Sequence, residues 1–321
     1  ERLGVAYRLH ADQLAVLNHV EYLHDYIPLV SIIVRPGVDL PGLQRCVESL
    51  FETTLHAHYE ILIVDNDVVG AAMAHWLLSM SQLGSSMLRV ISFPGAANDA
   101  AIHNFAANEA RGDYLILLNA QSVICAADWL DELLNHAQRP EVGVVGARVL
   151  SPYGKVLRAG LVLGMMGAAD SAFQGEDIDA RGYLQRLQVA HNWSAVSGDC
   201  LMVRKEVFEE IGGLDEQAVS LGLNDLDLCL RVGQAGYLVV WTPHASVVLS
   251  AQSPQLLEPA ARELHAQEQE TFYLRWLPKV ARDPAYNPQL SLTSSNFRLE
   301  SGIHGGWKPL YTRSVPSILA L

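Results

Sequence analysis

The alternation of short apolar runs with helical segments between residues 29 and 118 constrains the fold more than any other feature of this sequence. The apolar runs are 29–34 (LVSIIV), 60–66 (EILIVDN), 88–93 (LRVISF) and 114–118 (YLILL). The segments 40–54, 70–83 and 97–111 lie between them and have the pattern or composition of helices. Strands that are apolar throughout are buried on both faces, which is typical of a parallel sheet covered by helices. The sequence therefore predicts an α/β fold with a mostly parallel central sheet flanked by helices.

The rest of the chain divides into a leading segment, a second half of the domain and a tail. Residues 1–28 carry apolar side chains at helical spacing and predict a leading helical segment or linker. After residue 140 the pattern predicts glycine-punctuated strands at 141–150 and 160–167, strand then helix in 194–216, a helix in 223–237 and a strand in 237–243. We expect one domain over 29–250. The tail 251–321 is expected to hold a polar helix at 255–276 and an irregular extension. Because it ends in SVPSILAL, it is expected to lead to a further fused domain.

Composition excludes some classes of partner and location. The formal net charge is −13, so the chain lacks the basic surface that a nucleic-acid partner requires. Residues 1–20 mix polar and apolar side chains, unlike a signal peptide, and no run of 18 apolar residues predicts a transmembrane segment. The four cysteines lie in apolar stretches without C-x-x-C spacing, which favours buried free thiols. We therefore expect a cytoplasmic protein.

A series of segments, taken in order, resembles the family 2 glycosyltransferases with the GT-A fold, notably the rhamnosyltransferase-like branch. The resemblance covers about residues 29–250. Its segments are VSIIV (30–34), YEILIVDN (59–66), AAIHNFAANEARGDYLILLN (100–119), DWLDELL (128–134), EVGVVGARVL (141–150), AVSGDCLMVRKEVFEEIGGLDE (195–216), NDLDLCLRVGQAGY (224–237) and VVWTPHA (239–245).

The resemblance implies transfer of a sugar from a nucleotide-diphosphate donor to the hydroxyl of a glycan or protein acceptor, usually with inversion, as in cell-surface polysaccharide synthesis. This chemistry needs a carboxylate that takes the acceptor proton. Asp225 matches the family's catalytic base, although an Asp at the start of a helix can also be a simple N-cap. Asp227 and Arg231 would orient that base, or would form only an i,i+4 ion pair.

Other matching positions are implied to contact the two substrates. Asp65 and Asn66 match the pair that grips the donor nucleotide, and Asn104 matches a residue that faces the donor. Gly198 matches an acceptor-side glycine that lets the backbone approach a ligand, although a tight turn would also require glycine. Asp199 follows it and could contact a sugar. Because ligands bind beyond the carboxyl ends of parallel strands, we expect Asp65, Asn119 and Gln121 to line the same cleft as Asp225.

Three departures from the family's pattern affect the donor side. The metal-binding aspartates at the end of the strand 114–118 are replaced by Asn119, Ala120, Gln121 and Ser122. Uncharged oxygens bind Mg²⁺ or Mn²⁺ only weakly, so no tightly bound metal is expected and Asn119 and Gln121 become donor-binding candidates. No histidine occurs in 247–253, where the family often has a metal ligand, and we interpret His244 as a loop residue. The first strand continues with Arg35 instead of the usual Pro-Thr.

These departures leave two interpretations open. In the first, the domain is an active transferase in which Arg35 or another cation neutralises the diphosphate. In the second, it is an inactive GT-A-like domain that serves as a binding or scaffolding module in a larger multidomain glycosyltransferase. Fold alone does not decide between them.

Overall fold

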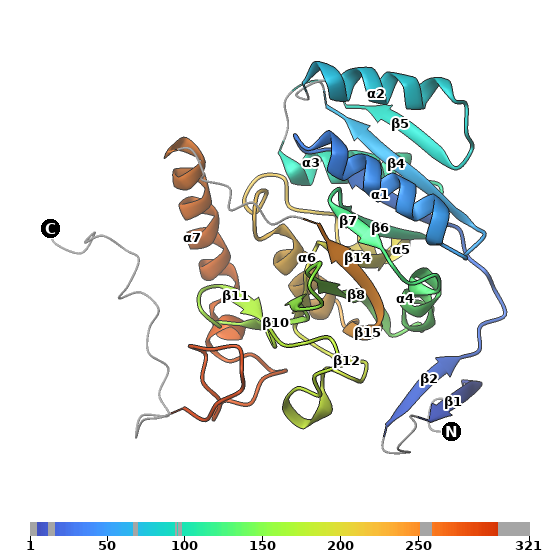
Figure 1. Cartoon of the computed structure of the whole chain (residues 1–321). Coiled ribbons are helices and arrows are strands. Elements are labelled where there is room, and N and C mark those ends of the chain that lie inside the picture. The colour runs from blue at the N-terminus through green and yellow to red at the C-terminus, as the bar shows by residue number, and fades with distance from the viewer. Residues whose placement is uncertain are drawn as a thin grey trace, which may run out of the picture.

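The computed structural model describes residues 5–11, 17–66, 70–93, 95, 98–250 and 259–300. One large mixed sheet forms the centre of the molecule (Figure 1). Its strands are β3 (Val30–Arg35), β4 (Tyr59–Asp65), β5 (Leu88–Ser92), β6 (Tyr114–Asn119), β7 (Ser122–Ile124), β8 (Val142–Leu150), β9 (Val156–Arg158), β12 (His191–Asn192), β14 (Cys200–Arg204) and β15 (Leu238–Leu249). A smaller sheet contains β10 (Gly160–Leu163), β11 (Ala169–Ser171) and β13 (Ala195–Val196).

The long strands of the central sheet run in one direction except for β14, and the short strand β12 at the edge is also antiparallel to its neighbour. Their order is β12-β15-β8-β14-β6-β3-β4-β5, with β7 paired to β15 and β9 paired to β8. The pairs β3–β4, β3–β6, β4–β5 and β8–β15 are parallel. Strand β14 is antiparallel to both of its neighbours, so β8 and β15 run in the same direction as β3 to β6. The prediction of a mostly parallel central sheet is confirmed.

Helices cover both faces of this sheet, as the apolar strands predict. Adjacent residues of β3 show the arrangement, since Ile32 and Ile33 are both fully buried but belong to different core clusters. The cluster around Ile32 includes α1 (Leu40–Thr53), α2 (Ala71–Gln82) and α4 (Trp129–Ala137). The cluster around Ile33 includes α3 (Asp99–Glu109), α5 (Lys205–Glu210) and α6 (Asn224–Gln234). The three predicted helices between residues 40 and 111 are therefore confirmed as α1, α2 and α3.

The prediction of a leading helix over residues 1–28 is wrong. The described residues there form an antiparallel hairpin of β1 (Tyr7–Ala11) and β2 (Asn18–Tyr22). Asn135 of α4 holds the hairpin, because its Oδ1 accepts from the Tyr22 N–H at 2.7 Å and its Nδ2 donates to the Val20 carbonyl at 2.8 Å. The helical spacing of the apolar residues is only a local pattern. Contacts with α4, which is distant in sequence, determine the structure of this segment instead. Two of the apolar residues that made up the helical spacing, Leu14 and Val16, lie outside the described residues.

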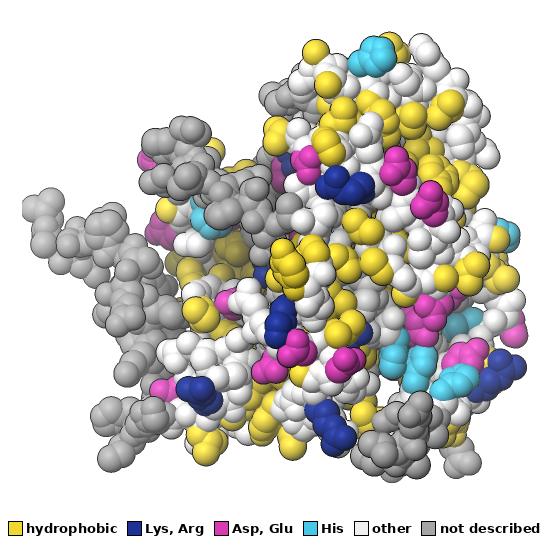
Figure 2. Space-filling view, in the orientation of Figure 1, with side chains coloured by type: hydrophobic (Ala, Val, Ile, Leu, Met, Phe, Trp, Pro, Cys, Tyr) yellow, Lys and Arg dark blue, Asp and Glu magenta, His cyan; other side chains and the backbone are white. Residues whose placement is uncertain are grey.

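Histidines gather where this hairpin meets the domain. Figure 2 shows His side chains beside acidic ones at the end of the molecule where Figure 1 places β1 and β2. His19 Nε2 lies 3.0 Å from Glu132 Oε2, and this contact raises the pKa of His19. The His19 ring also stacks on His244 at a centroid distance of 3.9 Å. The interpretation of His244 as a loop residue is therefore wrong, because it lies within β15 and packs against the hairpin.

The tail contributes to the same core as the domain. Helix α7 (Pro259–Ala281) extends further than the predicted helix at 255–276, and Figure 1 places it beside α6. Phe272, Trp276 and Val280 of α7 are buried in the core cluster that contains α3 and α6. The predicted boundary at residue 250 therefore does not separate two cores within the described residues. The terminal segment SVPSILAL, on which the expectation of a further domain depends, lies outside those residues.

The expectations about membrane-spanning segments and about the cysteines can be compared with the structure. Among the helices of the described ranges, we find none with the length and apolar character needed to cross a lipid bilayer. Cys46, Cys200 and Cys229 are buried free thiols, as predicted, but Cys125 is exposed. It follows the short strand β7 at the surface, where the apolar sequence pattern did not lead to burial.

Candidate active site at the carboxyl edge of the sheet

Three predicted donor-side residues lie at the carboxyl ends of adjacent strands. Asp65 ends β4 and Arg35 ends the neighbouring β3. Asn119 ends β6 and pairs with Arg35 in the strand register. Asn66, directly after β4, is buried. The parallel sheet thus brings these side chains to one edge, which is where such sheets bind ligands.

Asn119 also connects this edge to Asp199. The Asn119 backbone N–H donates to the Asp199 carbonyl at 3.0 Å, continuing the antiparallel pairing of β6 with β14. The Asn119 side-chain amide donates to Asp199 Oδ1 at 2.9 Å. Asp199 Oδ2 accepts from Ser197 Oγ at 3.0 Å and lies 3.6 Å from Arg158 Nε. Asp199 is therefore a half-buried carboxylate with three polar neighbours at the strand edge.

Gly198 connects Asp199 to Asp225. The Gly198 N–H donates to Asp225 Oδ2 at 2.7 Å, and the Leu226 N–H donates to Asp225 Oδ1 at 2.8 Å. A Cβ added at Gly198 would lie 3.1 Å from the Asp225 Cβ. Because φ of Gly198 is not positive, glycine is required here for space and not for a left-handed turn. The structure thus brings Asn119, Asp199 and Asp225 into one connected group.

The environment of Asp225 makes its carboxylate more basic than usual. Burial raises the pKa of Asp225 to about 6, the negative charge of Asp199 acts in the same direction, and the two backbone N–H donors oppose the shift. Asp225 is the second residue of α6, whose N-cap position is Leu223. The simple N-cap alternative is therefore wrong. The side chain is half-buried, retains access to solvent and stands near the positive end of a helix.

Asp227 connects α6 to α7. Its carboxylate is fully buried and accepts from Arg231 Nε at 2.7 Å, so the predicted i,i+4 pair is present. It also accepts from Arg275 Nη1 at 2.9 Å and from Trp276 Nε1 at 2.8 Å, both on α7. Asp227 and Arg231 therefore hold the helix that carries Asp225, and do so together with α7.

Asn104 forms hydrogen bonds with the loop that follows Gly213. Its Oδ1 accepts from the Leu214 N–H at 2.8 Å, and its Nδ2 donates to the Leu214 carbonyl at 2.9 Å and to Glu216 Oε1 at 2.7 Å. These bonds attach the loop after Gly213 to α3. A donor could contact the Asn104 side chain directly only by replacing some of these bonds.

The residues at the end of β6 do not form a carboxylate set for a tightly bound cation. Asn119 Oδ1 accepts from the Gln121 N–H at 3.0 Å, and Gln121 Nε2 lies 3.5 Å from Asp39 Oδ2. Ala120 between them has no side-chain oxygen. Throughout the ranges that the structure describes, no group of three or more His, Cys, Asp or Glu side chains has the arrangement of a metal site. The nearest carboxylates are those of Asp199 and Asp39, so a cation at this edge would meet amide oxygens as well as carboxylates.

Arg35 forms an ion pair with Asp99. Its Nη1 donates to Asp99 Oδ2 at 3.1 Å, and its Nη2 lies 3.1 Å from Asp99 Oδ1. Asp99 is in the first turn of α3, at the same edge of the sheet. A diphosphate that binds the Arg35 guanidinium would therefore compete with this bidentate ion pair.

Sequence reasoning missed several polar residues that complete the site. Asp39, Asp99 and Arg158 contact predicted residues, yet none of them belongs to a matching motif. Glu268 of α7 was missed as well, although it contacts the turn that leads into α6. The only signal for Asp39 and Asp99 was their position at a helix start, which is shared by many surface residues. Arg158, at the end of a short strand, and Glu268, within a helix, gave no signal.

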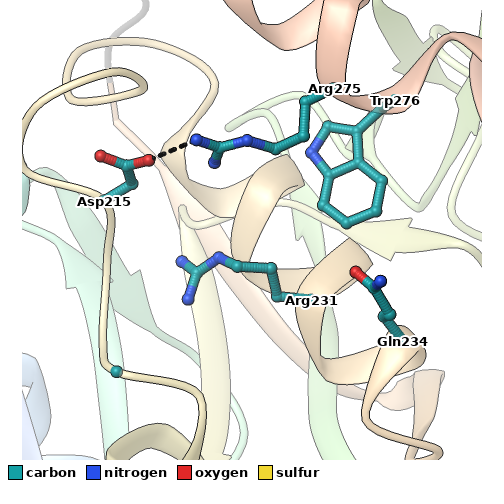
Figure 3. Close-up of a pocket in the computed structure, with 6 residues that line it drawn as sticks. Asp215, Arg231, Gln234, Arg275 and Trp276 are labelled. Carbon is teal, nitrogen blue, oxygen red and sulfur yellow. Dashed lines mark hydrogen bonds and ion pairs between the residues drawn. The ribbon is translucent and has the colours of Figure 1, made fainter.

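A surface cavity of about 480 Å³ lies between the second half of α6 and α7. Figure 3 shows its side chains, with Arg231 and Gln234 from α6 and with Arg275 pointing to Asp215. Asp225 does not line this cavity, so it is separate from the group at the carboxyl edge. The cavity is lined by Gly212, Asp215, Arg231, Gln234, Arg275 and Trp276.

Two solved structures are similar to this chain in fold. The mannosyltransferase PcManGT from Pyrobaculum calidifontis, in complex with GDP-Man and Mn²⁺, matches 79% of this chain and 65% of its own chain with a TM-score of 0.56 at 16% identity. GalNAc-T7 with UDP, GalNAc and Mn²⁺ matches 84% and 54% with a TM-score of 0.62 at 15% identity. The chain therefore has the GT-A fold.

Sequence comparison gives the family. The family description Glycosyl transferase family 2 matches residues 38–212, which is more than half of the chain. The chain belongs to this family, as the segments in the sequence predicted.

The relatives are of different lengths. An uncharacterised protein of Sinorhizobium fredii, y4gI, is 36% identical over 276 residues, or 85% of this chain and 30% of the relative. The O-antigen biosynthesis protein RfbC of Myxococcus xanthus is 36% identical over 281 residues, or 84% and 21%. The N-acetylglucosaminyl-diphospho-decaprenol L-rhamnosyltransferase of Mycobacterium tuberculosis is 28% identical over 270 residues, or 77% and 83%. The chain thus spans less than a third of the length of the first two relatives.

Proposed function

We propose that this chain is a catalytic domain that transfers a sugar, with inversion, from a nucleotide-diphosphate donor to an acceptor hydroxyl. One observation carries the proposal. The carboxylate of Asp225 is held at the ligand-binding edge of the sheet by the N–H groups of Gly198 and Leu226 and has a pKa of about 6. A general base of this kind is ionised at neutral pH and is more basic than an ordinary Asp.

The remaining residues of the edge would position the two substrates. As the acceptor oxygen bonds to the anomeric carbon, its proton passes to Asp225 and the nucleoside diphosphate leaves with the bonding electrons. Asp65 and Asn66 are proposed to bind the nucleotide, with Asn104, Asn119, Gln121 and Arg35 on the same donor side. Gly198 and Asp199 stand beside Asp225 and are proposed to face the acceptor. Asp227 and Arg231 hold α6 and support the base indirectly.

The charge of the leaving diphosphate needs a partner that the end of β6 does not supply by itself. A weakly held Mg²⁺ or Mn²⁺, arriving with the donor, would supply Lewis-acid stabilisation. Arg35 is the protein's own candidate, provided that a diphosphate displaces Asp99 from it. This exchange conserves charge pairing, because one anion replaces another around the guanidinium.

The names of the relatives support a substrate class. Two of them concern O-antigen biosynthesis and L-rhamnosyl transfer, so we propose a glycan acceptor in cell-surface polysaccharide synthesis and nucleotide-activated L-rhamnose as the first donor to test. A protein acceptor is compatible with the same chemistry. A cytoplasmic location and fusion to further domains, in line with the greater length of the first two relatives, belong to this proposal.

One alternative function is favoured by a specific observation. The ion pair between Arg35 and Asp99 and the amides at the end of β6 leave the donor side with little free positive charge. A domain that no longer turns over could therefore act as a binding or scaffolding module in a larger multidomain glycosyltransferase.

The test is Asp225→Asn in the full-length protein that carries this chain, assayed with dTDP- and UDP-activated L-rhamnose with and without Mn²⁺. Asn keeps the shape but removes the base, so we expect transfer to fall about 10²- to 10⁴-fold. Donor affinity, measured by calorimetry, should change little. The wild-type rate should rise with pH through about 6. Unchanged transfer in the variant would favour the scaffolding module.

A further inference from the structure

The residue at the N-cap position of α6 has no side-chain acceptor, and within the first turn Asp225 accepts only from the Leu226 N–H. The N-cap residue is Leu223, and no side-chain hydrogen bond from that position satisfies the first N–H groups. Leucine is among the poorest N-cap residues because it has no acceptor. The helix nevertheless has to hold Asp225, its second residue, against Gly198. The N–H groups of the turn that leads into α6 therefore need an acceptor from outside the helix.

Glu268 of α7 supplies this acceptor. Its Oε1 accepts from the N–H groups of Leu221 at 2.8 Å, Gly222 at 3.1 Å and Leu223 at 3.3 Å, and its Oε2 accepts from Gly222 at 3.1 Å. The residue is only 4% exposed. Three consecutive backbone donors converge on one buried carboxylate just before α6, where the helix dipole also favours negative charge.

The glycine in this turn is fitted to α7. A Cβ added at Gly222 would lie 3.1 Å from His265 Cε1 and 3.8 Å from Glu268 Oε2. His265 Nδ1 lies 3.2 Å from Glu268 Oε2 and is the titratable group that faces this carboxylate from its own helix. The contact is therefore close on both sides, and a change on either side should move the turn.

We propose that Glu268 is a positioning residue for Asp225, acting as a cap supplied by α7 to the start of α6. The inference rests on the proposed function of Asp225 as the base. It extends the catalytic unit to α7, which lies, as Asp225 and α6 do, beyond residues 38–212 that the family match covers. A general base displaced by about 1 Å loses on the order of 10²-fold in rate, so the cap would act on kcat more than on KM.

The test measures Asp225 directly, by ¹³C NMR titration of its carboxyl in this chain, with Asp225→Asn to assign the signal. In Glu268→Gln, one oxygen that accepts backbone N–H groups is replaced by an NH₂, which repels them. The turn loosens, Asp225 becomes more hydrated, and the midpoint of its titration should fall from about 6 toward the ordinary value of 3.8. Asp199 and Cys229, the other titratable groups near Asp225, are unchanged in this variant.

Gly222→Ala perturbs the same contact from the other side and should give the same direction of shift. Glu270→Gln and Gly233→Ala are matched controls, because Glu270 is exposed on α7 and a Cβ at Gly233 meets nothing within 4 Å. Both controls should leave the midpoint unchanged. With L-rhamnose donors, Glu268→Gln should lower kcat about 10²-fold with little change in KM.

An unchanged titration midpoint of Asp225 in folded Glu268→Gln and Gly222→Ala would overturn the inference. Unfolding of both variants at 25 °C would also overturn it, because the contact would then serve stability alone. The two proposals can fail separately. A shifted midpoint with full transfer by Asp225→Asn would support the positioning and overturn the base. Lost transfer by Asp225→Asn, together with an unchanged midpoint in the Glu268 variant, would support Asp225 as the base and overturn the positioning role of Glu268.

Discussion

Asp225 is held in a position that makes its carboxylate more basic and lowers the stability of the fold at neutral pH. Its carboxylate accepts two backbone hydrogen bonds, yet burial still dominates and raises its pKa to about 6 from an ordinary value of 3.8. The folded state therefore binds a proton more readily than the unfolded state between about pH 4 and 6. Stability from this group is present below pH 4, is lost as the pH rises through about 6, and becomes a cost at neutral pH. A basic, partly desolvated carboxylate is what proton transfer from a hydroxyl requires.

At the residue scale, Asp225→Asn should stabilise the chain at pH 7.5. It removes the charge that burial disfavours, and the pKa shift corresponds to a gain on the order of 1–3 kcal/mol in the free energy of unfolding. The gain should shrink at pH 5, where wild-type Asp225 is mostly protonated. Urea unfolding at both pH values measures the difference. Asp177→Asn, at a surface carboxylate that is 70% exposed, is the control and should change stability little at either pH. Equal gains at pH 5 and pH 7.5 would contradict the argument.

At the scale of elements, α6 and α7 form a unit through Asp227. Its fully buried carboxylate accepts from Arg231 on its own helix and from Arg275 and Trp276 on α7. Glu268 makes the second connection between the same helices. Glu268 thus fixes the turn that leads into α6, and Asp227 fixes the first turn of the helix. The backbone around Asp225 therefore has little freedom.

Asp227→Ala should therefore be strongly destabilising. The change leaves buried donors on Arg231, Arg275 and Trp276 without their acceptor, which costs about 3–5 kcal/mol when one partner of a buried pair is removed. Chemical denaturation followed by circular dichroism gives the value. Asp177→Ala breaks the exposed pair with Lys155 and should have little effect. A loss for Asp227→Ala no larger than that of Asp177→Ala would show that the α6–α7 connection carries little energy.

At the scale of the whole molecule, the sequence predicted what depends on local pattern and on motifs. Continuous apolar strands identified the buried sheet, and the NDLDLCLR segment placed Asp225 at the start of a helix. The hairpin β1–β2 was not predictable, because the hydrogen bonds that attach it to the domain come from Asn135, more than 110 positions away. Glu268 was hidden for the same reason. Nothing in the polar pattern of 255–276 distinguishes it from Glu263 and Glu270, which are exposed on the same helix.

The predicted boundary at residue 250 failed to anticipate how the tail packs, and this leads to a prediction for the whole molecule. Phe272 of α7 is fully buried in the core cluster that also contains Leu115 and Leu117 of β6. If α7 is part of one cooperative domain, Phe272→Ala should lower the global free energy of unfolding by about 3–5 kcal/mol through the cavity that it leaves. The slowest-exchanging amides of β6 should lose the same amount of protection, because they open only by global unfolding. Hydrogen exchange read by mass spectrometry measures both regions at once. Leu274→Ala is the matched control on the same helix, since Leu274 is 74% exposed and its truncation should leave β6 unaffected. Protection lost in α7 alone, with β6 unchanged, would show instead that the tail unfolds independently of the sheet that carries the candidate site.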